Sequence, residues 1–501
     1  MKITEVGKYL RILPSSDIEE HTLKMYLMGW RQRKNDPWIM VENNLINQIA
    51  LGQSIDSSVY NANQVEYTQV DPRLKDYQVE DVSRMLNLKH CINANPMGLG
   101  KTVEAIVFLR EMAARSICIV VPKIIRQQWV DQLKKWWGID AEIYENQKAL
   151  ERGKTYVVNY DKLRNETVLT KFKSFRWDCL VLDEAHKIKS KDSKQTIAVK
   201  QIPSARRVAL TGTPILRYVD DLWSLLHFLG EEYAGSSYWA FVEYCCEVQK
   251  TPWGNKIIGT TNNTRHQTVL HLLLKSIMIR HDSIEVAHGK TVEVVRLPMT
   301  KKQRDLYRKE KQLLLDELPE NCTISNGAVL TMRLRQTTSW PGLFVEGESG
   351  PKFEWVLEQC VNNPEEKFVV FTVFEKAATA LKDYLNSKDI KTVTITGKNN
   401  AQQNLESKKA FTKSNARVLV GTIGAMGQGY DELQLVSRTM IFLDRDWSPE
   451  IMKQAEERLH RMGQTSLVCI YYLECQGSFD QYVGRINLNK SEGIRSALTG
   501  D

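Results

Sequence analysis

Short runs of apolar and β-branched residues recur along this chain, and most of them are followed by a stretch with helical periodicity. Strands that alternate with helices in this way form a mostly parallel sheet covered by helices. The runs fall into two series separated by a long strand-poor region, so we predict an α/β fold with two parallel-sheet domains. The first series is "SICIVVP" (116–122), "TYVVNY" (155–160), "WDCLVLDEAH" (177–186) and "RRVALTGTP" (206–214). The second is "FVVFT" (368–372), "TVTIT" (392–396), "RVLVGT" (417–422), "TMIFLD" (439–444) and "VCIYYL" (468–473).

The chain is long enough for several domains. It has 501 residues, 42% of them hydrophobic, and single cores stop growing at ~250 to 300 residues. Glycines at 342, 347 and 350, followed by Pro351, predict a linker before the second series. The predicted regions are a small accessory domain (1–70), a first α/β domain (71–300) with helical insertions from about residue 215, a helical segment and linker (301–350), and a second α/β domain (351–501).

Composition excludes some classes of protein and leaves others open. The formal charge of +8, from 68 basic and 60 acidic residues, favours a polyanionic partner only weakly. The nine cysteines lack metal-ligand spacing, so neither a zinc site nor a disulfide framework is predicted, and a reducing compartment fits. No apolar run reaches the ~18 residues of a membrane helix, and the first residues lack a signal-peptide core. We therefore expect a cytoplasmic protein.

The motif "NPMGLGKT", which begins at Asn95, predicts a phosphate-binding loop between a strand and a helix. Gly98 and Gly100 permit close approach of the backbone to phosphate, Lys101 would neutralise the phosphates, and Thr102 would place a hydroxyl on Mg²⁺. Asn95 stands where this motif usually has glycine. A glycine-rich turn that merely caps a helix is the alternative interpretation.

Two adjacent carboxylates, Asp183 and Glu184, follow the apolar strand of "VLDEAH". They would lie at the carboxyl end of that strand, where ligands bind in parallel α/β sheets. Asp183 is predicted to hold Mg²⁺, and Glu184 to orient and deprotonate the attacking water. A helix cap is the alternative, because acidic residues suit first turns, but a cap does not account for the upstream phosphate loop.

Together these segments resemble the superfamily 2 helicases, and among them the SNF2-type DNA translocases. Each segment alone has limited specificity, and their shared order along the chain is what carries the resemblance. The resemblance implies two RecA-like domains, ATP and Mg²⁺ as cofactors, and DNA as partner. The segments are "DYQVEDV" (76–82), "MGLGKT" (97–102), "VPKIIRQQW" (121–129), "DEAH" (183–186), "LTGTP" (210–214), "DDLWSLLHFL" (220–229) and "QAEERLHRMGQ" (454–464).

The resemblance also assigns roles to single residues of the nucleotide site. Gln78 matches the glutamine that reads the adenine edge, which favours ATP, and Gln454 is expected to contact the nucleotide. Arg458 and Arg461 match the arginines that reach the γ-phosphate across the cleft between the domains. A planar guanidinium suits this role because it can stabilise charge that spreads over phosphoryl oxygens. Without the resemblance, "EERLHRMGQ" would read as an exposed charged helix.

Five further residues are expected to couple nucleotide hydrolysis to DNA. Thr211 and Thr213 lie in the segment that resembles the coupling motif, and His186 completes "DEAH". Gly427 and Gly429 belong to "GTIGAMGQGYD", which matches a DNA-contact segment of the second domain. Glycines would let that backbone approach phosphate, although an ordinary loop also uses them.

Three segments point to one branch of the family. "EYCCEVQKTPWGNKIIGTTN" (243–262), "LLKSIMIRHD" (273–282) and "QAEERLHRMGQTSLVCIYYL" (454–473) resemble annealing helicases that regress forks and phage-encoded branch-migration helicases. Chromatin remodellers commonly have Gln-Asn after "TGTP", where this chain has Leu216 and Arg217. The segment after "MIR" also departs from the usual Arg-Leu-Lys, because His281 begins "HDS".

We therefore predict an ATP-dependent translocase that acts as a monomer on branched or forked DNA, in a bacterial or phage-infected cell. An ATP-driven remodeller that displaces proteins from duplex DNA is the alternative, since the motor residues are shared. A nucleotide-gated clamp without turnover and an RNA helicase are further alternatives. Trp30, Trp38 and Trp253 would stack on unpaired bases or fill cores, and residues 1–70 would recognise DNA structure or support the motor.

Overall fold

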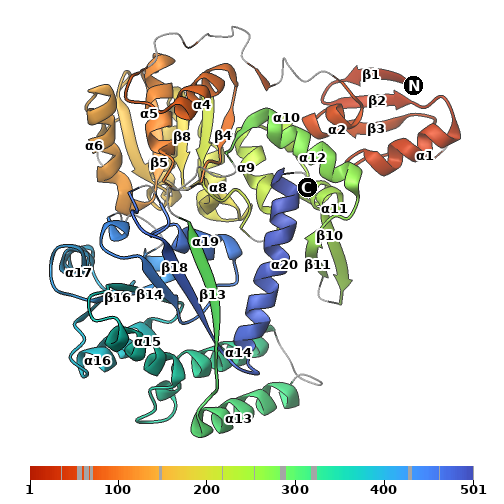
Figure 1. Cartoon of the computed structure of the whole chain (residues 1–501). Helices are drawn as coiled ribbons and strands as arrows, with labels where there is room; N and C mark the ends of the chain where they lie inside the picture. Colours follow the sequence, from red (N-terminus) through yellow and green to blue (C-terminus); the bar gives the residue numbers. More distant parts are fainter. Residues whose placement is uncertain are drawn as a thin grey trace. The chain divides into compact units, whose positions relative to one another are not determined.

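The structure is a computed structural model of the chain, and it describes residues 1–499 except 35, 54–58, 61–66, 68–70, 97, 146–148, 217, 253, 282–288, 318–323, 427–431 and 462 (Figure 1). Two compact units are present. Unit 1 comprises Met1–Ser283 and Lys490–Asp501, and unit 2 comprises Ile284–Asn489. The last helix, α20 (Phe479–Thr499), begins in unit 2, and its residues from Lys490 onward group with unit 1.

Unit 1 contains a seven-stranded sheet in the order β12-β4-β9-β8-β5-β7-β6, and all of its strand pairs are parallel. The central strands are buried on both faces, which explains why they read as continuous apolar runs. The strands are β4 (Cys91–Asn93), β5 (Ile117–Val121), β6 (Glu142–Ile143), β7 (Thr155–Asn159), β8 (Trp177–Asp183), β9 (Ser204–Leu210) and β12 (Met278–Ile279). The helices that accompany them are α4 (Asp76–Asn87), α5 (Lys101–Glu111), α6 (Arg126–Trp137), α7 (Glu166–Ser174) and α8 (Lys194–Lys200).

An insertion follows β9 in unit 1 and leads to β12. Helix α9 is almost entirely buried, which its mostly apolar sequence explains. Strands β10 and β11 form an antiparallel hairpin that is a separate two-stranded sheet. The elements are α9 (Asp221–Leu229), α10 (Glu231–Ala234), α11 (Tyr238–Cys245), β10 (Cys246–Thr251), β11 (Gly254–Thr260) and α12 (Thr264–Ile277).

The N-terminal residues form a module that consists of a three-stranded antiparallel sheet with its own small core. This module is fastened to the insertion: His266 Nε2 lies 2.8 Å from the Met25 carbonyl oxygen, and the Arg265 guanidinium stacks on Tyr26 at 3.7 Å. Leu45 and Ile46 join the main core of unit 1. The module is therefore part of unit 1. Its elements are β1 (Lys2–Val6), β2 (Tyr9–Leu13), α1 (Asp17–Tyr26), β3 (Ile39–Glu42) and α2 (Leu45–Ala50).

Unit 2 contains a six-stranded parallel sheet in the order β13-β18-β17-β14-β16-β15. Two apolar clusters cover it, one of which includes Phe371 and Phe442 and the other Phe353 and Phe368. Its strands are β13 (Lys290–Leu297), β14 (Phe368–Thr372), β15 (Thr392–Ile395), β16 (Val418–Thr422), β17 (Thr439–Phe442) and β18 (Val468–Cys475). Its helices, besides the start of α20, are α13 (Lys301–Glu317), α14 (Ile324–Ser339), α15 (Pro351–Asn362), α16 (Glu375–Asn386), α17 (Ala401–Lys413), α18 (Ile423–Met426) and α19 (Pro449–Glu456).

The predicted α/β class with two parallel sheets is confirmed, and every strand of the two predicted series is present. The region from 215 to 350 differs from the prediction, because it contributes four strands, β10 to β13. Strand β13 pairs with β18 along its whole length, so residues 290–297 belong to the second sheet and not to a first domain that ends at 300. The units divide after Ser283, upstream of the glycines at 342 to 350. Strand β13 is mostly exposed, and its polar residues hid it in the sequence.

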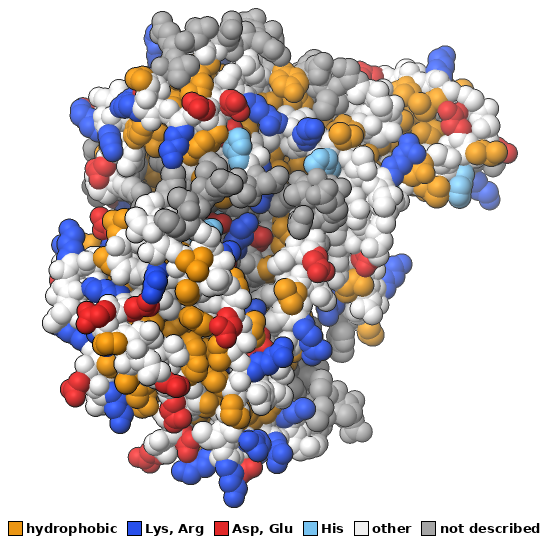
Figure 2. All heavy atoms as spheres, viewed as in Figure 1, with side chains coloured by type: hydrophobic (Ala, Val, Ile, Leu, Met, Phe, Trp, Pro, Cys, Tyr) orange, Lys and Arg blue, Asp and Glu red, His pale blue; other side chains and the backbone are white. Residues whose placement is uncertain are grey.

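Among the described residues, no helix combines the length and apolar character that crossing a membrane requires. Figure 2 shows basic and acidic side chains interspersed over most of one face.

Candidate active site

The predicted phosphate loop joins β4 to α5 in unit 1. Helix α5 begins at Lys101, and Gly100 precedes it as a cap with φ of 89°. Gly98 also has a positive φ, of 84°. L-residues with side chains rarely adopt this left-handed backbone, so the two glycines are required by the turn itself. No side chain caps the helix start, and the N-terminus of a helix favours a bound anion.

Lys101 lies across the loop. Its Nζ donates to the carbonyl oxygen of Asn95 at 2.7 Å and to that of Pro96 at 3.1 Å. The positive charge is thus held at the position where the loop would enclose phosphate. Phosphate oxygens are stronger acceptors for an ammonium than neutral carbonyls are, so a bound nucleotide can take over these hydrogen bonds.

Gln78, the predicted adenine-reading residue, packs against the same loop from α4. Its Nε2 donates to the Leu99 carbonyl oxygen at 2.9 Å, and the Tyr77 hydroxyl donates to that oxygen at 2.9 Å. A Cβ on Gly100 would collide with the Gln78 amide. Gln78 therefore supports the loop in this structure, and its contact with adenine stays a prediction.

Asn95, where the motif usually has glycine, anchors the loop through its side chain. Its Nδ2 donates to Asp81 Oδ2 at 2.7 Å, and its Oδ1 accepts the backbone N–H of His281 at 3.1 Å. His281 Nε2 in turn lies 2.9 Å from Asp81 Oδ1. Two residues that depart from the usual motifs, Asn95 and His281, therefore contact each other and share Asp81. Sequence reasoning did not find this network.

Glu104 on α5 extends the network beneath the loop. Its Oε2 accepts from Asn93 Nδ2 at 2.6 Å and from Asn95 Nδ2 at 3.3 Å. Burial raises the pKa of Glu104 to about 7, and the nearby Asp81 carboxylate raises it as well, while the Asn93 hydrogen bond lowers it. A carboxyl group that is often protonated near neutral pH can lie close to Asp81 with little repulsion.

Asp183 ends β8 and is held in place from three directions. Trp129 Nε1 donates to its Oδ2 at 2.7 Å, the Glu184 N–H donates to its Oδ1 at 2.8 Å, and the Tyr160 hydroxyl donates to its carbonyl oxygen at 2.7 Å. Burial raises the pKa of Asp183, and the Glu184 carboxylate raises it further, whereas Trp129 and Lys101 lower it. Trp129 and Tyr160 are supporting residues that sequence reasoning missed.

Glu184 has left-handed backbone, with φ of 51°, although it is not glycine. Such backbone costs of the order of 1 kcal/mol and concentrates at functional sites. Its Oε2 lies 3.3 Å from His186 Nδ1. His186 was predicted to couple to DNA, and its position allows it to orient the proposed catalytic carboxylate.

Thr211 and Thr213 follow β9, which lies between β4 and β8 in the sheet. The Thr211 N–H donates to the Asn93 carbonyl oxygen at 3.0 Å, and the Thr213 N–H donates to Thr211 Oγ1 at 3.1 Å. Both threonines are buried. The two threonines therefore lie after β9, between the phosphate loop that follows β4 and the carboxylates at the end of β8. Their coupling to DNA stays a prediction.

The residues present fit Mg²⁺ bound in part by phosphate. Among the described residues, no group of three or more His, Cys, Asp or Glu side chains could hold a metal ion. Mg²⁺ is usually bound by one or two protein groups together with phosphate oxygens and water. Thr102, at the start of α5, and Asp183 are the residues that would hold it.

The other predicted nucleotide residues lie in unit 2. Gln454 belongs to α19, and Arg458 follows that helix; both are buried, whereas Arg461 is half-buried. Gln464 anchors this segment, because its Nε2 donates to the Ser437 carbonyl oxygen at 3.0 Å. The roles of Gln454, Arg458 and Arg461 at the nucleotide stay predictions, and Gly427 and Gly429 lie outside the described residues.

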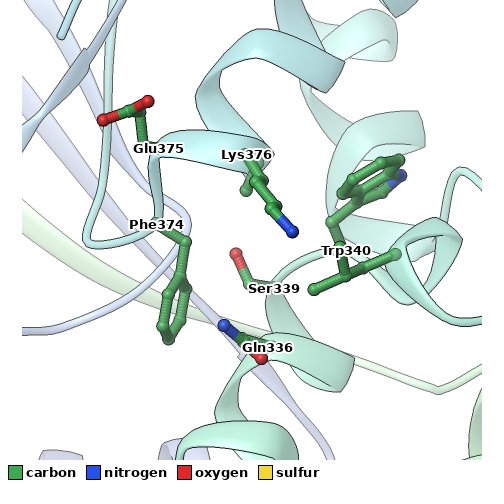
Figure 3. Close-up of a pocket in the computed structure, with 8 residues that line it drawn as sticks. Gln336, Ser339, Trp340, Phe374, Glu375 and Lys376 are labelled. Carbon is green, nitrogen blue, oxygen red and sulfur yellow. The ribbon is translucent and has the colours of Figure 1, made fainter. Parts of the chain in front are cut away.

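Unit 2 also contains a cavity of about 160 Å³ next to the end of β14 (Figure 3). Trp340 and Phe374 flank it, and the Lys376 ammonium and the Gln336 amide lie on its other sides. No residue predicted for the nucleotide site lines it.

Comparison with known proteins gives two family matches. Residues 38–343 match the SNF2-related domain, and residues 351–463 match the helicase conserved C-terminal domain. The "SWI/SNF-related matrix-associated actin-dependent regulator of chromatin subfamily A member 1" of Homo sapiens is 25% identical over 82% of this chain and 42% of its own length. The "Probable ATP-dependent DNA helicase CHR12" of Arabidopsis thaliana is 26% identical over 82% of this chain and 40% of its own length.

Among solved structures, the Sulfolobus solfataricus SWI2/SNF2 ATPase core in complex with dsDNA is 22% identical. The match covers 88% of this chain and 96% of that one, with a TM-score of 0.41. The chain spans less than half the length of the curated relatives it matches.

Proposed function

Because the chain belongs to the SNF2-related family, we propose that it is an ATP-driven DNA translocase that acts on branched duplex DNA. The observation that carries the proposal is the convergence in unit 1 of a phosphate loop and two carboxylates. Lys101 follows β4 and Asp183 ends β8, and β9 separates these two strands in the sheet. Parallel strands place their carboxyl ends along one edge, which is where α/β sheets bind nucleotides.

The side chains of unit 1 have separate proposed tasks. Lys101 and the first turn of α5 bind the phosphates, and Gln78 orients the base. Glu184 accepts the proton of the attacking water, with His186 holding its carboxylate. Mg²⁺ held by Thr102 and Asp183 would neutralise charge on the phosphates. Arg458 and Arg461 are proposed to complete the site from unit 2, which would make hydrolysis depend on domain closure.

DNA as the partner follows from the family, and branched DNA is the finer proposal. The segments 243–262 and 454–473, which resemble annealing and branch-migration helicases, support it. A motor that holds duplex backbone makes phosphate contacts that carry no sequence information. Its DNA binding should therefore depend on salt and hardly on sequence.

The accessory module, residues 1–70, is the proposed reader of DNA structure. Trp30 is 40% exposed and faces an open groove with Lys24, Arg33 and Lys34. Trp38 is only half-buried but lies beneath the Arg11 guanidinium at 4.7 Å, whereas Trp30 is the more exposed of the two, although Lys24 Nζ lies 5.3 Å from the centre of its ring. Trp30 is therefore the better candidate for stacking on an unpaired base. Trp30→Ala should weaken fork binding by about 1 to 3 kcal/mol, and equal affinity of wild type and variant for a fork would refute this role.

A second candidate function, displacement of proteins from duplex DNA, is favoured by the relatives. The human relative is named a regulator of chromatin, and a Saccharomyces cerevisiae relative, 24% identical over 82% of this chain, is named a chromatin-remodeling complex ATPase. The proposed motor residues are the same for both functions, so only the substrate separates them.

Steady-state ATP turnover with matched amounts of single-stranded DNA, linear duplex, forked duplex and four-way junction tests the proposal. A labelled junction in the same reactions reports branch movement. We expect the highest turnover on forks or junctions, together with ATP-dependent junction movement. Equal turnover on linear duplex without junction movement would favour protein displacement. Greater stimulation by RNA would favour an RNA helicase, and no turnover at all would favour a nucleotide-gated clamp.

A further inference from the structure

Helix α13 of unit 2 has one strongly basic face. Within three turns, Lys301, Lys302, Arg304, Arg308, Lys309 and Lys311 are all exposed. At 100° per residue these six side chains fall on one half of the helix. Asp305 is the one exposed acidic residue between 301 and 313, and it falls on the same half of the helix as the six basic residues. The face therefore carries an excess of positive charge that the modest net charge of the chain conceals.

The opposite side of α13 is fixed to unit 2. Gln303 is buried, and its Nε2 donates to the Thr337 carbonyl oxygen of α14 at 2.9 Å. The buried Tyr307 accepts the Phe479 N–H at its hydroxyl oxygen at 2.8 Å. The basic face thus stands on a firmly held helix, which reduces the entropy that binding must overcome.

Local acidic groups neutralise only part of this charge. Lys302 pairs with Glu348 at 3.3 Å, and the Arg304 guanidinium donates to the Met299 carbonyl oxygen at 3.1 Å. Glu310, which is buried, pairs with Arg333 of α14 at 3.5 Å. Among the described residues, no carboxylate lies within ion-pair distance of the remaining cations of the face, which are Lys301, Arg308, Lys309 and Lys311.

We propose that the basic face of α13 binds the phosphate backbone of duplex DNA, as a contact separate from the motif segments. From Lys301 to Lys311 the helix rises ~15 Å, a length over which one DNA strand carries about four phosphates when measured along the DNA axis, at ~3.4 Å of axis each. Figure 2 shows Lys and Arg side chains gathered at the lower end of the view, where Figure 1 draws α13. This inference rests on the proposed DNA motor and adds a surface to it.

The chemistry of the face favours phosphate over bases or lipid. Between residues 301 and 313 the only exposed large apolar side chain is Leu313, and the one aromatic ring, that of Tyr307, is buried. Base stacking therefore has no platform there. The apolar side of α13 lies in the core with Met299 and Leu334, so it cannot insert into a membrane surface as an interfacial helix would. The contact should be independent of sequence.

The test is the salt dependence of binding to a fluorescent 30-base-pair duplex. Lys301, Lys309 and Lys311 are replaced together by Gln. A control variant carries Gln at Lys388, Lys409 and Lys413, which are also exposed in unit 2 and have no ion pair among the described residues. Both variants lose three positive charges, so a general effect of net charge is the same in each.

We expect the slope of log K against log salt to become less steep in the α13 variant, by about 2 to 3. Binding in 0.1 M salt should weaken about 10-fold or more. The control should change the slope by less than about 1. DNA-free ATP turnover and thermal unfolding should match wild type in both. Equal slopes for the two variants would overturn the α13 contact while leaving the motor intact. A wild-type chain that does not bind duplex at all would instead refute the proposed function.

Discussion

Each parallel sheet has an aspartate and a lysine near its carboxyl edge, but the contacts of the lysine differ between the two units. In unit 1, Asp183 ends β8, and Lys101 begins α5 and contacts backbone carbonyls of the loop that joins β4 to it. In unit 2, Asp444 follows β17, and Lys352 is the second residue of α15. Lys352 is only 1% exposed, and its Nζ lies 2.8 Å from Asp480 Oδ2 and 3.9 Å from Asp444 Oδ1.

Asp444 is surrounded by partners from its own unit. Thr372 and Ser339 both donate hydroxyl hydrogen bonds to its Oδ2. Burial lowers the pKa of Lys352, but Asp480 and Asp444 outweigh it and raise that pKa above its usual value. The Lys352 ammonium therefore stays charged inside the protein. The lysine and aspartates of unit 2 thus satisfy one another, whereas in unit 1 Lys101 contacts the carbonyl oxygens of its glycine-containing loop, which is why we propose the edge of unit 1 as the nucleotide site.

Breaking the ion pair of unit 2 should have the largest effect on stability. Lys352→Met leaves Asp444 and Asp480 buried without their cation, which costs about 3 to 5 kcal/mol. Urea unfolding followed with a probe in unit 2 should show this loss, while ATP binding at unit 1 persists. Unchanged stability together with lost ATP binding would mean that Lys352 serves the ligand and that the two edges are alike.

Removing the lysine of unit 1 should affect chemistry and leave the fold intact. Lys101→Ala removes a charge that the phosphates need, so kcat/KM for ATP should fall about 100- to 1000-fold. Thermal unfolding should stay near wild type, because the hydrogen bonds of Lys101 Nζ to the Asn95 and Pro96 carbonyl oxygens stay within its own loop. Lys388→Ala, an exposed change in unit 2, is the control. Wild-type turnover by Lys101→Ala would refute the loop assignment.

Restoring the usual glycine at position 95 tests the loop anchor. Asn95→Gly removes the hydrogen bonds to Asp81 and His281, which should raise KM for ATP about 10-fold, or ~1.4 kcal/mol. His281→Ala should raise KM less, and its effect should shrink in the Asn95→Gly background because the two residues share Asp81. Additive effects on KM would show that the two residues act independently, and an unchanged KM in both single variants would show that the network has no influence on nucleotide binding.

A substitution at the other end of β4 should change the stability of the protein and leave nucleotide binding unchanged. His90 is buried just before β4, and its Nδ1 accepts the Arg207 N–H at 3.0 Å. Burial lowers the pKa of His90 to about 3, and Lys89, Arg207 and Arg206 lower it further. Since the unfolded chain binds a proton near pH 6.5 and the folded chain does not, stability is complete above that pH and falls as the solution is acidified towards pH 3.

His90→Gln keeps an acceptor for Arg207 and cannot titrate. Through His90, the wild-type free energy of unfolding should fall by about 1.4 kcal/mol per pH unit below about pH 6, and the variant should not show this fall. Urea unfolding from pH 4 to 8 measures the difference. KM for ATP should not change at pH 7.5. Parallel pH profiles for the two proteins would mean that His90 takes up its proton in the folded state.

The strands of the two sheets and the phosphate loop could be predicted from local sequence. The strands of both sheets were visible because buried parallel strands are continuous apolar runs, and the loop was visible because Gly98, Gly100 and Lys101 stand in a spacing that few structures need. Strand β13 was missed because most of its residues are exposed. The hydrogen bonds that anchor the loop could not be predicted, because folding brings together residues that are distant in the sequence. Asn95 lies 14 residues from Asp81 and 186 from His281.

Nucleotide stoichiometry tests the central claim most directly. Glu184→Gln should bind ATP without hydrolysing it, so equilibrium dialysis with labelled ATP and Mg²⁺ can count the sites. We predict one ATP per chain, lost when Lys101→Ala is added to the same protein. Two ATP molecules per chain, or one that persists without Lys101, would contradict the account that the carboxyl edge of unit 1 is the nucleotide site.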